Sequence, residues 1–112
     1  MNLQTLIDEL QLTVYTEKKD FASVQPSGGY AADLLSCAMA SAKPGNLWVT
    51  LQAHLNIVAV AALTEVCAVV ISEGSTPEAE VINKANAQGV TLLGTAAGTY
   101  QVVGKLWEQG IR

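Results

Sequence analysis

Basic side chains are scarce in this sequence, and none of them forms a cluster. The 112 residues contain six lysines and arginines against ten acidic residues, which leaves a formal net charge of −4. A protein that binds the phosphate backbone of a nucleic acid needs a basic stripe or patch. The composition therefore predicts no nucleic-acid partner.

Long apolar runs are missing as well. The longest uninterrupted one, Ile57 to Leu63, is far shorter than the ~20 residues that a membrane-spanning helix needs. The N-terminal segment carries Asp8 and Glu9, where a secretory signal would be basic and then apolar. We therefore expect no membrane partner and a cytoplasmic location.

Cysteine and histidine are too few and too widely spaced to predict a metal site. Cys37 and Cys67 lie far apart, and His54 is the single histidine. No C-x-x-C or H-x-x-x-H spacing of the kind found in zinc sites is present. We expect no metal and no cofactor, and we interpret both cysteines as reduced, apolar groups in or near the core.

The glycine-rich loops that bind phosphate are absent in their recognisable forms. Neither G-x-x-x-x-G-K-[ST] nor G-x-G-x-x-G occurs. The pair Gly28-Gly29 precedes a patterned apolar segment, and we interpret it as shaping the turn into Tyr30 to Leu35, with a phosphate cradle as the alternative.

A nucleophile assembly is not predicted either. Asp33, Ser36 and His54 supply the residue types of such an assembly, but they lack the spacing of a nucleophile elbow. We therefore expect no catalytic residues and no enzymatic activity.

What the sequence does contain is an alternation of extended apolar runs and helical segments. Repeated β-α units imply parallel strands joined by right-handed crossovers. We expect residues 1–112 to form a single α/β domain with a mainly parallel β-sheet, β-α repeats in the second half and helices packed on the sheet. The expected pairs are Leu47 to Leu51 with Ile57 to Val66, Cys67 to Ile71 with Pro77 to Ala87, and Val90 to Leu93 with Thr99 to Gln109.

The first half is less regular. Apolar residues at helical spacing predict a helix from Asn2 to Leu10, and alternation predicts a strand from Leu12 to Tyr15. A second extended piece is expected around Phe21 to Val24. The pattern from Tyr30 to Leu35 predicts either a strand or a strand that continues into a short helix through Met39, and it does not distinguish these two alternatives.

The helix expected from Asn56 to Val66 has no polar face over its first two turns. A helix that is apolar all round must be covered all round. Because a sheet covers only one side, we predict a homodimer whose interface includes this helix. The alternative cover is the N-terminal helix of the same chain.

Polar residues and glycines follow each expected parallel strand. Ligands of parallel sheets bind outside the carboxyl ends of the strands, where helix N-termini offer N–H groups to anions. We therefore predict a site for a small anionic ligand or nucleotide there, although Ser, Thr and Gly also serve simply as caps in such loops. The candidate ligand-binding residues are Gly28, Gly29, Asp33, Thr50, Gln52, His54, Asn56, Ser72, Gly74, Thr95 and Thr99.

Several of these residues fall in a pattern that resembles the DRTGG domain over nearly the whole chain. The resemblance is carried by Gly28-Gly29-Tyr30, Asp33-Leu34-Leu35-Ser36, Gly45 to Thr50, Asn56 to Ala61, and Thr95 with Thr99-Tyr100. Of the name-giving run, only the glycines remain here.

The resemblance implies an α/β domain like the N-terminal domains of HPr kinase and the Mur ligases. It also implies a regulatory appendage that is not itself a catalyst and that occurs beside catalytic or CBS domains or alone. From this we expect a non-catalytic sensor that acts on a partner enzyme. The alternative is a ligand-free structural module for dimerisation or interaction.

Overall fold

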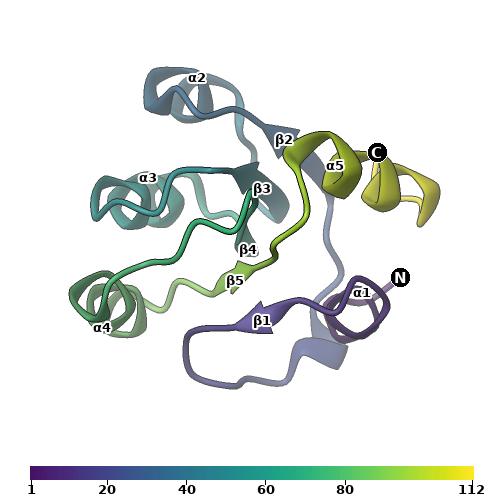
Figure 1. The fold of residues 1–112 in the computed structure, drawn as a ribbon, viewed down its shortest axis with the longest axis horizontal. Coiled ribbons are helices and arrows are strands. Elements are labelled where there is room, and N and C mark those ends of the chain that lie inside the picture. Colours follow the sequence, from purple (N-terminus) through teal and green to yellow (C-terminus); the bar gives the residue numbers. More distant parts are fainter.

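In the computed structural model, which describes residues 1–112, a five-stranded sheet lies between two layers of helices (Figure 1). The α/β fold predicted from the repeated β-α pattern is confirmed. The elements in chain order are α1 (Leu3–Glu9), β1 (Thr13–Val14), the 3-10 turn η1 (Phe21–Ser23), β2 (Gly28–Ala31), α2 (Leu35–Ser41), β3 (Asn46–Thr50), α3 (Asn56–Thr64), β4 (Ala68–Ile71), α4 (Ala79–Gln88), β5 (Leu92–Gly94) and α5 (Thr99–Glu108).

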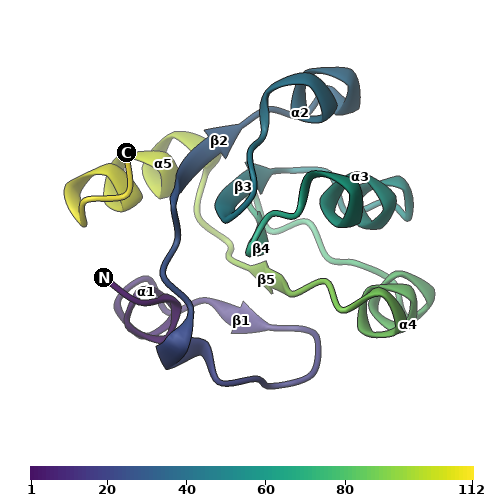
Figure 2. The same ribbon diagram turned by 180° about the vertical axis from the view of Figure 1, so that it is seen from behind.

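The strands are arranged in the order β1-β5-β4-β3-β2. Strands β2 to β5 are parallel and follow one another in the chain, while β1 pairs antiparallel with β5. Because every right-handed crossover steps to the next strand in the same direction, α2, α3 and α4 lie on one face. Helices α1 and α5 cover the other face (Figure 2).

Alternating side chains of the central strands fill two separate cores. Leu47 and Val49 of β3 pack with residues of α1 and α5, whereas Trp48 between them packs with residues of α2, α3 and α4. All five residues of β3 and all four of β4 are buried. Burial on both faces explains why residues 47–49 and 68–71 are continuously apolar in the sequence.

Helix α3 is covered differently from the prediction. Its neighbours on the same face, α2 and α4, pack against it on both sides, so other helices of the same chain supply most of the cover for which we predicted a partner subunit. The N-terminal helix does not cover it either, because α1 lies on the opposite face. Of its apolar side chains, Ala59 and Leu63 remain exposed.

In the first half of the chain, two segments differ from the prediction and the structure decides between the alternatives left open for a third. Gly28-Gly29 is not a turn: both residues belong to β2. Phe21–Ser23 forms a 3-10 turn rather than an extended piece, with Phe21 buried beneath α1. The open alternative at Tyr30 to Leu35 resolves as a strand followed, after a short loop, by helix α2.

None of the helices has both the length and the apolar character that crossing a bilayer requires.

Candidate functional site

Nine of the eleven predicted ligand-binding residues lie in the loops that follow β2, β3, β4 and β5 or at the ends of these elements. We call this edge, formed by residues 32–34, 50–56, 72–78 and 95–99, the rim. Because neighbouring strands in the sheet are also neighbours in the chain, the four loops lie in a row along one end of the sheet. The rim therefore forms where the sequence predicted it.

Asp33 joins the first two loops of the rim. Its Oδ1 accepts hydrogen bonds from the hydroxyl of Thr50 at 3.0 Å and from the backbone N–H of Leu51 at 2.8 Å. The same hydroxyl of Thr50 accepts a bond from the backbone N–H of Gln52 at 3.1 Å. The carboxylate thus holds the loop after β3, and its accepting oxygen is already engaged within the chain.

The last two loops are tied together by Glu73, which is not among the predicted ligand-binding residues. Its backbone N–H donates to the carbonyl of Ala97 at 2.8 Å, and its carboxylate accepts from the backbone N–H of Thr99 at 2.7 Å. Thr99 is the first residue of α5, and the N-cap position before it is Gly98, which has no side chain to accept that bond. Glu73 therefore caps α5 from another loop and places a carboxylate where an anion would bind.

The hydroxyls of the same two loops are also paired. Ser72 Oγ and Thr99 Oγ1 lie 2.6 Å apart, and Thr95 Oγ1 accepts from the backbone N–H of Ala97 at 3.1 Å. No buried side-chain nitrogen or oxygen in the chain lacks a hydrogen-bond partner. Half of the eight polar side chains predicted to contact a ligand, those of Asp33, Thr50, Ser72 and Thr99, thus bond between the loops of the rim.

An open hollow of about 470 Å³ lies between the loop after β3 and the beginning of α4. Gln52 and His54 line one side, and Thr76, Glu78 and Glu80 line the other. His54 is exposed, and its Nδ1 lies 3.4 Å from the backbone N–H of Asn56, the first residue of α3. This contact gives His54 a role at the beginning of the helix and leaves Nε2 free to meet a ligand.

The rim is acidic. It carries Asp33, Glu73 and Glu78, with Glu80 just inside α4, and no lysine or arginine lies in any of its loops. No group of three or more His, Cys, Asp or Glu side chains in the chain is arranged to hold a metal ion. A phosphate at the rim would therefore meet backbone N–H groups, hydroxyls and His54, with carboxylates close by.

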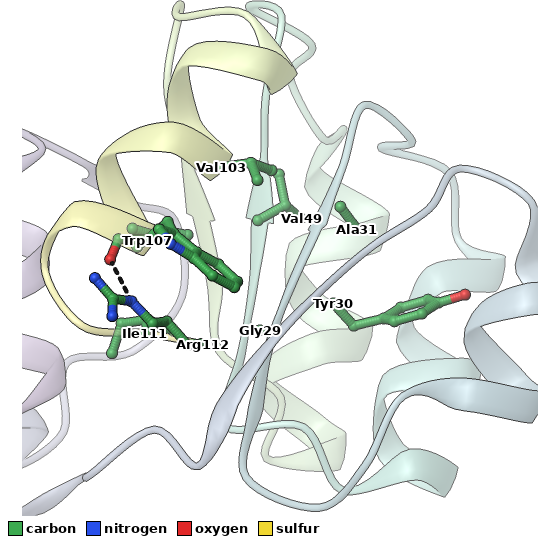
Figure 3. A pocket seen from close by; sticks show the side chains of 9 residues that line it. Gly29, Tyr30, Ala31, Val49, Val103, Trp107, Ile111 and Arg112 are labelled. Carbon is green, nitrogen blue, oxygen red and sulfur yellow. Dashed lines mark hydrogen bonds between the residues drawn. The ribbon is translucent and has the colours of Figure 1, made fainter.

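Gly28 and Gly29 do not join this set, because they begin β2 at the opposite end of the sheet. A Cβ on Gly28 would lie 3.0 Å from the carbonyl oxygen of Arg112, the last residue of the chain. Gly28 thus allows the C-terminal segment to approach β2 closely. Gly29 lines a small apolar groove between β2 and α5, beside Trp107 and Ile111 (Figure 3).

The two cysteines are unpaired and differ in environment. Cys37 is exposed on α2, so the prediction that it lies in or near the core is wrong, whereas Cys67 is half-buried just before β4. Burial raises the pKa of the Cys67 thiol to about 11, although hydrogen bonds to nearby backbone groups act in the other direction. Cys67 is therefore an unreactive packing group at neutral pH, as predicted from its apolar context.

The fold and the rim define a three-layer α/β domain with a mostly parallel sheet, whose loops at the carboxyl ends are held together by their own side chains. The chain belongs to the DRTGG domain family: the family pattern matches residues 5–108. A search of curated protein sequences found no match.

Among solved structures, the chain is similar to the CBS and DRTGG domains of the regulatory region of Clostridium perfringens pyrophosphatase, crystallised with its activator diadenosine tetraphosphate. The TM-score is 0.78 at 17% sequence identity, and the match covers 98% of this chain and 47% of that one. The chain thus spans about half the length of that structure, and the likeness concerns the fold.

Proposed function

We propose that this chain is a non-catalytic regulatory domain of the cytosol that binds a nucleotide at the rim and acts on a partner enzyme. The observation that carries the proposal is its family: the DRTGG domain accounts for nearly the whole chain, and a structure of the same fold belongs to an enzyme's regulatory region crystallised with a nucleotide activator. The position of the hollow, outside the carboxyl ends of parallel strands, also supports it.

The hollow between the loop after β3 and the beginning of α4 is the part of the rim best suited to a nucleotide. Its volume of about 470 Å³ falls within the range of small-molecule sites, about 300–1,000 Å³. Gln52 and Thr76 offer a donor and acceptors for the polar edge of a base, and His54 offers a flat ring to stack on. Glu78 and Glu80 repel phosphates, so we propose that the base enters and that the phosphates point outward.

This arrangement predicts an unusual dependence on ions. A magnesium ion on the phosphates reduces the negative charge that approaches the acidic rim, so magnesium should strengthen binding. Salt screens the repulsion between two negative groups, so affinity should not fall as the salt concentration rises. A site built on lysines and arginines would behave in the opposite way.

Isothermal titration with diadenosine tetraphosphate, ATP and adenosine, each with and without magnesium, tests the proposal. The variants Gln52→Ala and His54→Ala should each weaken binding about tenfold, which corresponds to about 1.4 kcal/mol. Gln88→Ala is the matched control, because Gln88 is exposed at the far end of α4. In thermal melts, a ligand at 100 times its Kd should stabilise the native state by about 2.7 kcal/mol.

The second candidate is a ligand-free module for dimerisation or interaction, and one observation favours it. The carboxylate of Asp33 and the hydroxyls of Ser72 and Thr99 already form hydrogen bonds within the chain, so few polar groups of the rim are available to a ligand. If no nucleotide produces heat or a shift in melting temperature, this candidate replaces the nucleotide-binding one.

We propose no catalysis, because two of the three candidate groups, Asp33 and His54, already form hydrogen bonds within the chain. Asp33 accepts from Thr50 and Leu51, and His54 faces the backbone N–H of Asn56. Release of phosphate from ATP by the pure protein, lost in Asp33→Ala or His54→Ala, would contradict the non-catalytic assignment.

A further inference from the structure

Helix α5 carries an exposed aromatic stripe. Tyr100 is 83% exposed and Trp107 is 56% exposed, while Val102 and Leu106 on the opposite side of the helix are buried. Tyr100, Gly104 and Trp107 are spaced four and three residues apart, so they lie on one face of the helix. We call this outward face, together with Val103 beside it, the α5 stripe.

Gly104, in the middle of the stripe, has no explanation within the chain. A glycine inside a helix lowers its stability relative to alanine. Its φ lies outside the positive range, and a Cβ built at this position would meet nothing within 4 Å. Neither backbone conformation nor packing in the monomer therefore requires glycine, whereas a second backbone that approaches from outside would.

The centre of the stripe is formed by small side chains. Val103 and Gly104 lie midway between Tyr100 and Trp107. When two copies of α5 cross antiparallel about a twofold axis at that midpoint, each Tyr100 lies opposite the partner's Trp107. The small residues at the centre then allow the two backbones to come close.

We propose that a second copy of this chain docks on the α5 stripe and forms a twofold symmetric dimer. A shallow hollow of about 510 Å³ lies over Gly104, between Tyr100 and Trp107, and it offers a place for the partner's aromatic side chain. The groove between β2 and α5, which shares Val103 and Trp107 with this hollow, continues the apolar surface toward the sheet edge (Figure 3).

The exposed area is consistent with a dimer interface. Aromatic side chains have areas of up to about 250 Å², so Tyr100 and Trp107 at their observed exposures offer roughly 300 Å² per copy. A standard interface buries about 800 Å² per partner. The two aromatic rings thus supply more than a third of it, and the remaining stripe and the adjoining groove supply further area.

The stripe is a better interface than α3. The exposed apolar side chains of α3 are Leu63, at 68% exposure, and the small Ala59. Tyrosine and tryptophan are the residue types that most often dominate binding energy at interfaces. The homodimer predicted from the sequence is thus retained, with its interface moved from α3 to α5.

Sedimentation equilibrium of the full chain over a range of concentrations tests the inference. The wild type should approach twice 11.7 kDa, and Gly104→Gln should weaken self-association at least tenfold. Because glutamine is the better helix former, the monomer of this variant should melt no lower than wild type. Ala87→Gln, which places the same side chain on the exposed surface of α4, is the matched control and should leave the dimer unchanged.

Leu63→Gln separates the two interfaces, because it removes the one large exposed side chain of α3. The inference is overturned if the wild type stays at 11.7 kDa at high concentration. It is also overturned if Leu63→Gln dissociates the dimer while Gly104→Gln does not.

A second measurement reports the orientation. Trp48 is fully buried already, so a concentration-dependent blue shift of tryptophan emission should come from Trp107 and should vanish in Trp107→Phe. Gly104→Cys, combined with Cys37→Ser and Cys67→Ser, should form a disulfide-linked dimer under mild oxidation, because the twofold axis brings the two substituted positions together. Absence of this cross-link in a chain that still dimerises would refute the antiparallel arrangement.

Discussion

The carboxylate of Glu73 caps helix α5 from a different loop, and removing it should loosen the rim measurably. The bond to the backbone N–H of Thr99 is 2.7 Å long and joins residues 26 positions apart. Loss of an N-cap acceptor costs about 1 kcal/mol, and loss of a negative charge at the positive end of a helix costs about 0.5 kcal/mol more. Glu73→Ala should therefore lower the free energy of unfolding by about 1.5 kcal/mol, or the Tm by roughly 6 °C.

Two companion substitutions separate the causes. Glu73 has a φ of 62°, a left-handed conformation that costs a non-glycine residue about 1 kcal/mol. Glu73→Gly loses the cap but relieves this cost, so it should be about 1 kcal/mol more stable than Glu73→Ala. Glu73→Gln keeps an acceptor and loses the charge, so it should lose about 0.5 kcal/mol, and that difference should shrink in high salt.

Urea denaturation followed by circular dichroism measures all three variants against wild type. If Glu73→Ala is as stable as wild type, the carboxylate does not cap α5 in solution. If Glu73→Gly is less stable than Glu73→Ala, the assignment of backbone strain to this position is wrong.

Two further predictions concern buried groups. Trp48→Phe removes the hydrogen bond from Nε1 to the carbonyl of Ala32 at 2.9 Å, and the unpaired carbonyl should lower the free energy of unfolding in urea by about 1–2 kcal/mol. The control Trp107→Phe should change the stability of the monomer by less than about 0.5 kcal/mol. Equal losses of stability in the two variants would contradict the role of the bond. Because the pKa of the Cys67 thiol is raised from 9.0 to about 11, the unfolded chain releases this proton at lower pH than the native one. Stability should fall as the pH rises from about 9 to about 11, and this part of the fall should disappear in Cys67→Ala but not in Cys37→Ala.

The second half of the fold was predictable because each element carries its own local signal. Strands β3 and β4 are short apolar runs buried on both faces, and Gly89, at a φ of 72°, ends α4 as the sequence indicates. Helix α4 begins at Ala79, two residues after the proline expected to open it. Pairing of the two-residue strand β1 with β5 was not predictable, since it joins segments far apart in the chain and has no local signature.

For the rim, the location was predictable and the contacts were not. The rule that loops at the carboxyl ends of parallel strands form sites placed Asp33, Thr50 and Thr99 correctly at one end of the sheet. The bond from Glu73 depends on a left-handed backbone that sequence rarely signals outside glycine. The prediction of a turn at Gly28-Gly29 was wrong because adjacent glycines usually mark a turn. Here Gly28 instead lets the carbonyl of Arg112 approach strand β2 closely.

The antiparallel pairing of β1 with β5 also bears on how the chain folds as it is synthesised. Strands β2 to β5 are laid down in the order in which they sit in the sheet, so each new strand can join its predecessor as it emerges. Thr13 pairs with Gly94, which leaves the ribosome about 80 residues later, or roughly 4–16 s later at ordinary rates of elongation. During that interval the apolar face of α1, with Leu3 and Leu6, has no completed sheet to cover, so its apolar side chains stay exposed until the last strand of the sheet has formed.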